Sequence, residues 1–170
     1  MTIHNFHDSL AFSHAQADAP WWGEVYRKAF PSLAAMVNVR EDGWAQRGGI
    51  DRVLTLAGGK TIWIDEKVRK VAYDDVTLEY WSSVEHRRPG WVEKDLACDF
   101  IAYAWLPTRR CVLLPFLPLR AAWREHFFDW ITSYKEIRGG NRGYTTISVG
   151  VPTDVLLSAM NDAMSIRWGA

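Results

Sequence analysis

The chain has 170 residues, enough for one domain with a sizeable core, and its apolar share of 48% and charged share of 24% are typical of a globular protein. Its formal net charge at pH 7 is zero, so no overall basic field marks it as a nucleic-acid binder, although a local patch could still serve. Ten tryptophans are many for this length. Aromatic side chains pack cores and also stack on bases or ligands, and we expect most of these to pack the core.

The beginning of the chain has neither the basic segment nor the apolar segment of a signal peptide, and no apolar run is long enough to span a bilayer. Cys98 and Cys111 lack the C-x-x-C spacing of metal ligands, so we expect two free, buried thiols. We therefore expect a soluble protein of the reducing cytoplasm, without a membrane partner.

Polar residues 1–19 predict a loosely ordered N-terminal arm, whose histidines, His4, His7 and His14, are spaced too irregularly to predict a metal site. Apolar positions at helical spacing then predict a helix over residues 20–39, bent or broken at Pro31. The next elements are expected to be a loop at 44–49, a β-hairpin of two strands at 50–56 and 61–69, and a third strand at 76–82.

In the second half of the chain, the expected helices and strands alternate. The expected elements are a short helix at 89–97, strands at 99–106 and 110–117, a helix at 118–134, a loop at 138–143, a strand at 144–151 and a helix capped by Thr153 that reaches about residue 164. The order α-β-β-β-α-β-β-α-β-α, without an internal linker, predicts a single domain over residues 1–170. Its expected fold class is α/β, more specifically an α+β arrangement in which helices pack on the faces of a mixed sheet.

The register of the hairpin decides which side chains share a face. A two-residue turn would mix apolar and polar side chains on both faces. A three-residue loop instead collects the apolar residues on one face and places Asp51, Asp65 and Lys67 on the other. Because a slip of one residue inverts every face, the hydrophobic match should select this register, with an odd-length loop and a glycine bulge. Glu66 then points to the opposite face, where we expect it to pair with a base.

Two carboxylates held side by side repel each other unless one is protonated or a cation binds between them. Mg²⁺ and Mn²⁺ prefer oxygen ligands and retain waters, so Asp51 and Asp65 suit either ion. A lysine beside such an ion can orient a water or stabilise the charge that develops on a phosphate under attack. The pattern of Asp51, Asp65 and Lys67 therefore indicates phosphodiester hydrolysis, and the alternative is an ion pair at the end of a strand.

The order of Asp51, a turn and then Asp65-Glu66-Lys67 resembles the signature of the PD-(D/E)XK nuclease superfamily, an acid followed on the next strand by acid-x-lysine. The stretches GGIDRVLTLAGGKTIWIDEKVR, TLEYWS, PGWVEKDLACDFIAYAW and RCVLLPF are similar to those of small phage and prophage proteins of that superfamily. The resemblance covers residues 46–117. It implies a restriction-endonuclease-like αβββαβ core, to which this chain would add a C-terminal strand and helix.

The resemblance also implies an activity, a Mg²⁺-dependent deoxyribonuclease that can use Mn²⁺ instead and cuts DNA internally. Asp51 and Asp65 would bind the metal together with the backbone carbonyl of Glu66, and Lys67 would be the catalytic lysine. If the protein is phage-encoded, it would act in the cytoplasm of the host cell.

Further residues are candidates for the same site or for DNA contact. Many members of the superfamily add a glutamate from the first helix or a polar residue before the first strand, which suggests Glu24 and Gln46, although Arg27 and Lys28 offer Glu24 ordinary helix pairs. Glu79, an acid within the apolar third strand, could extend the acidic cluster or pair with an arginine. Basic residues near the motif could contact phosphates or simply aid solubility: Lys60, Arg69, Lys70 and Lys94.

Two other functions remain open at this point. The fold could be kept as a catalytically inactive nucleic-acid- or protein-binding module, or the protein could be a phage factor that blocks a host enzyme. No recognition domain is visible, so we expect a nuclease that is specific for DNA structure or only weakly specific for sequence. A double-strand cut by so small a protein would need a homodimer.

Overall fold

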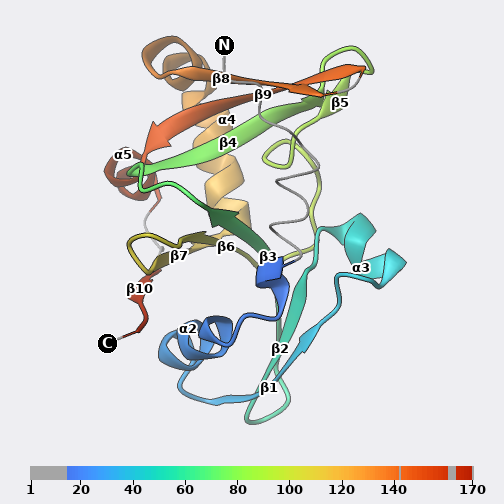
Figure 1. The fold of residues 1–170 in the computed structure, drawn as a ribbon, viewed down its shortest axis with the longest axis vertical. Helices are drawn as coiled ribbons and strands as arrows, with labels where there is room; N and C mark the ends of the chain where they lie inside the picture. Colours follow the sequence, from blue (N-terminus) through green and yellow to red (C-terminus); the bar gives the residue numbers. More distant parts are fainter. Residues whose placement is uncertain (1–14, 142, 161–163, 170) are drawn as a thin grey trace. The chain divides into compact units, whose positions relative to one another are not determined.

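The computed structural model describes residues 15–141, 143–160 and 164–169 (Figure 1). Residues 1–14 of the expected arm, with its three histidines, lie outside the described residues. Contacts between residues divide the chain into two compact units. One, which we call the hairpin unit, contains residues 15–72, 95–117 and 164–169, and the second unit contains residues 73–94 and 118–160. No linker was visible in the sequence because segments of the two units alternate along the chain.

The protein is a mixed α+β protein, as predicted, with two sheets. The hairpin unit contains a six-stranded mixed sheet in the order β1-β2-β3-β6-β7-β10, in which β3 and β6 are parallel and the other pairs antiparallel. The second unit contains a four-stranded antiparallel sheet in the order β5-β4-β9-β8. Within the part of the chain that is described, no helix has the length and apolar character needed to cross a membrane.

The elements are, in chain order, α2 (Trp21–Ala29), β1 (Leu33–Asn38), α3 (Gly43–Gly48), β2 (Arg52–Leu56), β3 (Thr61–Arg69), β4 (Asp75–Ser83), β5 (Arg88–Pro89), β6 (Phe100–Trp105), β7 (Arg110–Pro115), α4 (Phe116–Ser133), β8 (Glu136–Asn141), β9 (Tyr144–Pro152), α5 (Thr153–Ala159) and β10 (Met164–Arg167).

Strands β2 and β3 form the predicted hairpin in the predicted register. Leu54 lies opposite Ile62, and the loop beyond the last closing pair has three residues, 57–59. Gly58 and Gly59 have φ angles of 95° and 86°, the left-handed region that favours glycine. The odd-length loop that the hydrophobic match requires is therefore present.

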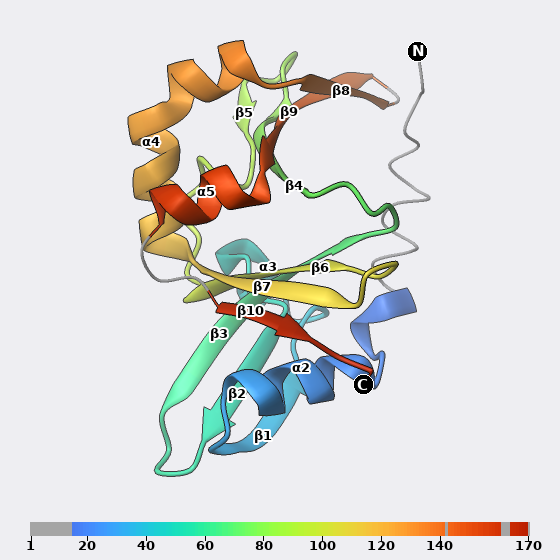
Figure 2. The ribbon, with the colours of Figure 1, turned by 90° about the vertical axis from the view of Figure 1, so that its left-hand side faces the viewer.

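The core of the hairpin unit lies on the apolar face of this hairpin. Helix α2 contacts β1 and β10 (Figure 2). The buried residues that pack together include Trp22, Val25, Tyr26, Leu54, Ile62, Ile64, Ala102 and Leu113. Burial of this apolar face holds the register, since a slip of one residue would bring charged side chains into the core.

The prediction of one helix over residues 20–39 was wrong beyond Ala29. Leu33 and Met36 fit helical spacing, but the chain leaves the helix before Pro31, and Met36 pairs with Leu54 of β2. Residues 44–49, expected as a loop, are mostly helical, because the Asp42 side chain caps α3.

The predicted third strand pairs with a different sheet. Strand β4 is bonded to β5 and β9, and the neighbour of β3 is β6. Helix α2 and strands β1, β2, β3 and β6 follow the α-β-β-β…β order of the expected core, but the connection from β3 to β6 contains β4 and β5 instead of a helix. The short helix expected at 89–97 is absent.

Strands β6, β7 and β9 and helix α4 agree with their predictions. Residues 138–141, expected in a loop, belong to β8, which forms a hairpin with β9. Helix α5 ends at Ala159, and Thr153 is its first residue, buried and without a capping hydrogen bond. The chain then supplies β10 to the sheet of the hairpin unit, beside β7.

Candidate active site

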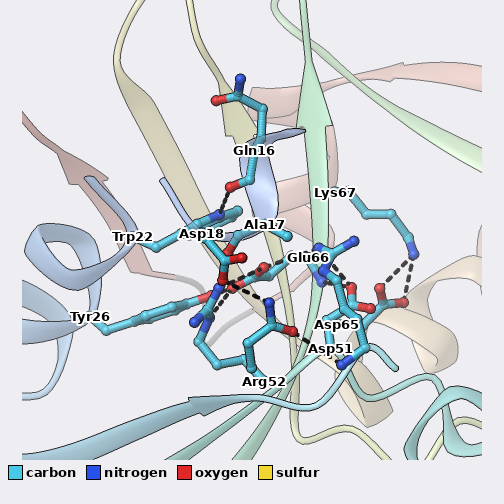
Figure 3. Close-up of polar contacts among 12 residues, drawn as sticks. Gln16, Ala17, Asp18, Trp22, Tyr26, Asp51, Arg52, Asp65, Glu66 and Lys67 are labelled. Carbon is cyan, nitrogen blue, oxygen red and sulfur yellow. Dashed lines mark hydrogen bonds and ion pairs between the residues drawn. The ribbon is translucent and has the colours of Figure 1, made fainter. Parts of the chain in front are cut away.

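Asp51 and Asp65 face each other across the start of the hairpin. Asp51 directly precedes β2, and its N–H donates to the Ile64 carbonyl at 2.8 Å, just beyond the last pair of the β2–β3 ladder, Arg52 with Ile64. The Asp51 and Asp65 side chains lie close enough for the Asp51 charge and a hydrogen bond between the two carboxyl groups to raise the pKa of Asp65. The two predicted carboxylates therefore lie side by side at the end of the hairpin that is remote from its loop (Figure 3).

Lys67 completes the predicted cluster. Its Nζ lies 2.6 Å and 2.7 Å from the two carboxylate oxygens of Asp65. The Asp65 side chain is 6% exposed, whereas 30% of the Lys67 side chain is accessible. The ammonium group thus stands at the solvent side of the acid that it contacts.

Burial raises the pKa of Asp65 to about 6, against the opposing charge of Lys67 and with a further rise from the nearby Asp51 carboxylate. A buried carboxylate whose ionised form is penalised in this way gains from any additional cation. Mg²⁺ commonly binds through one or two carboxylates and keeps several waters. The oxygens of Asp51 and Asp65 therefore fit Mg²⁺ or Mn²⁺.

The backbone of Glu66 adds a third oxygen on the same side. Its N–H donates to Asp51 Oδ2 at 2.8 Å, and the N–H and C=O of one strand residue point to the same neighbouring strand. The Glu66 carbonyl is thus directed toward the same edge of β3 as Asp51. Within the described residues, no three His, Cys, Asp or Glu side chains form a group that could hold a metal ion.

The Glu66 side chain lies on the opposite face, as predicted, in a buried network of charges. Its Oε1 accepts hydrogen bonds from Arg52 Nε at 2.6 Å and from the Tyr26 hydroxyl at 2.8 Å (Figure 3). Its Oε2 accepts a hydrogen bond from Arg40 Nη2 at 3.0 Å. Burial and the Glu66 charge raise the pKa of Tyr26 well above its usual value, so the phenol remains a donor.

Residues 15–19 of the expected arm contribute to this network. The Ala17 carbonyl accepts a hydrogen bond from Arg52 Nη2, and the Gln16 carbonyl accepts one from Trp22 Nε1 at 3.1 Å. Ala17 is itself buried. Gln16 and Ala17 are therefore held beside the buried network of charges around Glu66.

Arg40, like Tyr26 and Arg52, is a residue that the sequence analysis did not identify. Its Nη2 lies 3.2 Å from Asp51 Oδ2 and 3.0 Å from Glu66 Oε2, so one guanidinium group bridges the two faces of the hairpin. The Val39 N–H donates to the Asp51 carbonyl at 2.9 Å, which brings Arg40 to this position. Its role depends on the β1–β2 pairing, and no local pattern could have indicated it.

The additional site candidates lie on three different elements, α2, α3 and β4. Glu24 pairs with Lys28 at 2.9 Å and accepts a hydrogen bond from the Gly169 N–H, also at 2.9 Å. Gln46 is exposed on α3. Glu79 lies on β4, in the sheet of the second unit.

The basic candidates lie at scattered places. Lys60 is exposed at the loop of the hairpin, at the far end of β3 from Lys67. Arg69 ends β3 and donates from Nη1 to the Tyr103 hydroxyl at 3.0 Å, and Lys70 follows it at the surface. Lys94 belongs to the second unit.

Comparisons of the chain with protein-family models, with curated proteins and with solved structures found no significant match.

Proposed function

We propose that the protein is a metal-dependent endonuclease that hydrolyses phosphodiester bonds of DNA. The observation that carries this proposal is the gathering of Asp51, Asp65 and Lys67 at one end of the β2–β3 hairpin, with Lys67 Nζ 2.6 Å from Asp65. The order of α2, β1, β2, β3 and β6 gives further support, because it agrees with much of the αβββαβ core of PD-(D/E)XK nucleases.

Each member of the cluster has a role in this proposal. Asp51, Asp65 and the Glu66 carbonyl would hold Mg²⁺ or Mn²⁺. When bound, the ion supplies Lewis acidity and a water of lowered pKa. Lys67 is held by Asp65 at the edge of the cluster, where its charge can orient the attacking water and stabilise the extra negative charge on the phosphate. Water attacks phosphorus, the bond to one ester oxygen breaks, and the products are a phosphate monoester and a hydroxyl group.

The buried network beneath the cluster explains why an acid stands between Asp65 and Lys67. Glu66 fixes β3 from the core side through Arg52 and Tyr26. Its backbone N–H and its link to Arg40 fix Asp51. Catalytic groups must be held close to their working geometry, and rigid strands with such support achieve this better than loops.

The proposal extends to the setting of the reaction. We infer a cytoplasmic enzyme of the phage or prophage type, acting on DNA with little sequence specificity, and as a homodimer where both strands are cut.

The test is nicking of supercoiled plasmid by the purified chain in Mg²⁺, in Mn²⁺ and in EDTA. The wild type should nick DNA only with metal, Asp51→Asn should lose the activity, and Glu24→Gln, a change in a partly exposed acid outside the cluster, should keep it. A well-folded wild type that cuts no nucleic acid with either ion would contradict the nuclease and favour the inactive binding module.

A further inference from the structure

We propose that Trp44, supported by Trp63, stacks on an unpaired base of the DNA beside the scissile phosphate. The preferred substrate would then be a single strand, flap or branch. The location beside the scissile phosphate rests on the proposed function, whereas the stacking itself does not.

Trp44 is unusually exposed for its type. It retains 58% of its surface accessible, whereas Trp22, Trp105 and Trp123 are buried. Its ring meets that of Trp63 edge to face, with centroids 5.7 Å apart and planes at 89°. The contact holds the indole in place while more than half of the residue remains open to solvent.

The helix that carries Trp44 is fixed at both ends. At the start of α3, Asp42 Oδ1 accepts hydrogen bonds from the N–H groups of Trp44, at 2.8 Å, and Ala45, at 3.2 Å. At its end, Gly49 is left-handed, with φ 66°, and a Cβ there would lie 2.7 Å from Leu96 Cδ2. A rigid, preorganised indole loses little conformational entropy when it stacks on a ligand.

The position of Trp63 links this pair to the cluster. Trp63 lies on β3 two residues before Asp65, so both side chains leave the same face of the sheet. The distance along β3 from Trp63 to Asp65 is therefore about 6.7 Å, which is roughly the length of two nucleotides in a stacked DNA strand. Helix α3 lies beside the end of the hairpin that is remote from its loop, the end that carries Asp51 (Figures 1 and 2).

The surroundings of Trp44 favour a nucleotide over an apolar protein surface. The exposed residues that flank it in sequence are Glu41, Asp42, Gly43, Gln46 and Arg47, none of which has a large apolar side chain. Arg47, three residues later on the same side of the helix, forms no ion pair within the described residues and could contact a phosphate. Asp42 is engaged as the helix cap, which leaves Glu41 as the exposed acid nearby.

An indole cannot stack on a base that is already covered on both sides within a duplex. Unpaired bases offer a free π-face, and loss of one such contact weakens binding by about 5- to 150-fold. The arrangement therefore predicts discrimination by DNA structure without contact to base edges.

The test is binding in EDTA, where no metal-dependent cut occurs, measured by anisotropy of two labelled DNAs, a 5′ flap and a fully paired duplex. Trp44→Ala should weaken flap binding by at least 5-fold and leave duplex binding within 2-fold, and Trp44→Phe should keep most of the flap affinity. Trp81→Ala, a change in a tryptophan of the second unit that is 37% exposed, should alter neither. Circular dichroism should show the same fold for all variants.

An unchanged flap affinity of Trp44→Ala, an equal loss for both DNAs, or a wild type that binds neither DNA would overturn the stacking proposal. The nuclease is tested separately by cleavage in Mg²⁺. A wild type that prefers the flap through Trp44 but never cuts would leave the stacking contact and remove the nuclease. A wild type that cuts, with a flap preference that survives Trp44→Ala, would remove only the stacking contact.

Discussion

The backbone N–H of Glu66 donates to Asp51 Oδ2 at 2.8 Å, so the residue that anchors the buried face of the hairpin also orients the acid on the opposite face. Arg40 joins the same two residues through their side chains. The chemistry proposed for one face therefore depends on charges buried in the other.

Arg40 should act as a positioning residue for Asp51. Arg40→Met removes the cation 3.2 Å from Asp51 Oδ2, and loss of a partner behind a metal ligand typically lowers metal affinity by about 10- to 100-fold. Isothermal calorimetry with Mn²⁺ measures the change. Arg27→Met, a change in an exposed arginine of α2, should bind Mn²⁺ as the wild type does. Equal affinity of Arg40→Met and wild type would show that Asp51 needs no such support.

The buried pair of Arg52 and Glu66 should couple strongly in stability. Arg52→Met leaves a buried carboxylate with fewer partners and should lower the free energy of unfolding by about 3–5 kcal/mol. Glu66→Gln removes the charge that Arg52 neutralises, so Arg52→Met combined with it should cost clearly less than the sum of the single changes. Urea denaturation in EDTA gives all four values, and strict additivity would contradict the pairing.

Asp65 should make the metal-free protein less stable as pH rises from about 4 to 6. The pKa of this carboxyl is about 6 when folded, against an ordinary 3.8, so the folded state binds the extra proton across that window. Thermal unfolding in EDTA should show this slope, level off above pH 6, and lose the slope in Asp65→Asn. Asp129→Asn, a change in an exposed carboxylate of α4, is the matched control. A wild type and Asp65→Asn with parallel pH profiles would refute the assignment.

The hairpin and its register could be predicted from the sequence because they depend on short-range facts. Leu54 and Ile62 must share a face, and only an odd-length loop allows this. That one requirement also placed Asp51 with Asp65 and put Glu66 on the other face. The core and the cluster demand the same register, which is why the prediction succeeded.

The parts that could not be predicted depend on long-range pairing. Leu33 and Met36 fit a helix as well as a strand, and only the pairing with β2 makes them β1. Arg40 reaches Asp51 through that same pairing. The neighbours of β4 depend on long-range pairing too, because strands that follow each other in sequence usually pair, whereas this chain enters the second unit after β3 and returns with β6.

Single-turnover cleavage by Lys67→Ala tests the central claim most directly. Labelled duplex and branched DNA are cut at saturating Mg²⁺ by wild type, Lys67→Ala and Asp51→Ala, with folding checked by circular dichroism. Lys67→Ala should bind DNA and metal nearly as the wild type does and cut about 10²- to 10³-fold more slowly, because its charge acts on the transition state. Asp51→Ala should lose metal binding and cleavage together. If Lys67→Ala cuts as fast as the wild type, the ammonium group beside Asp65 serves only as an ion pair, and the catalytic account is wrong.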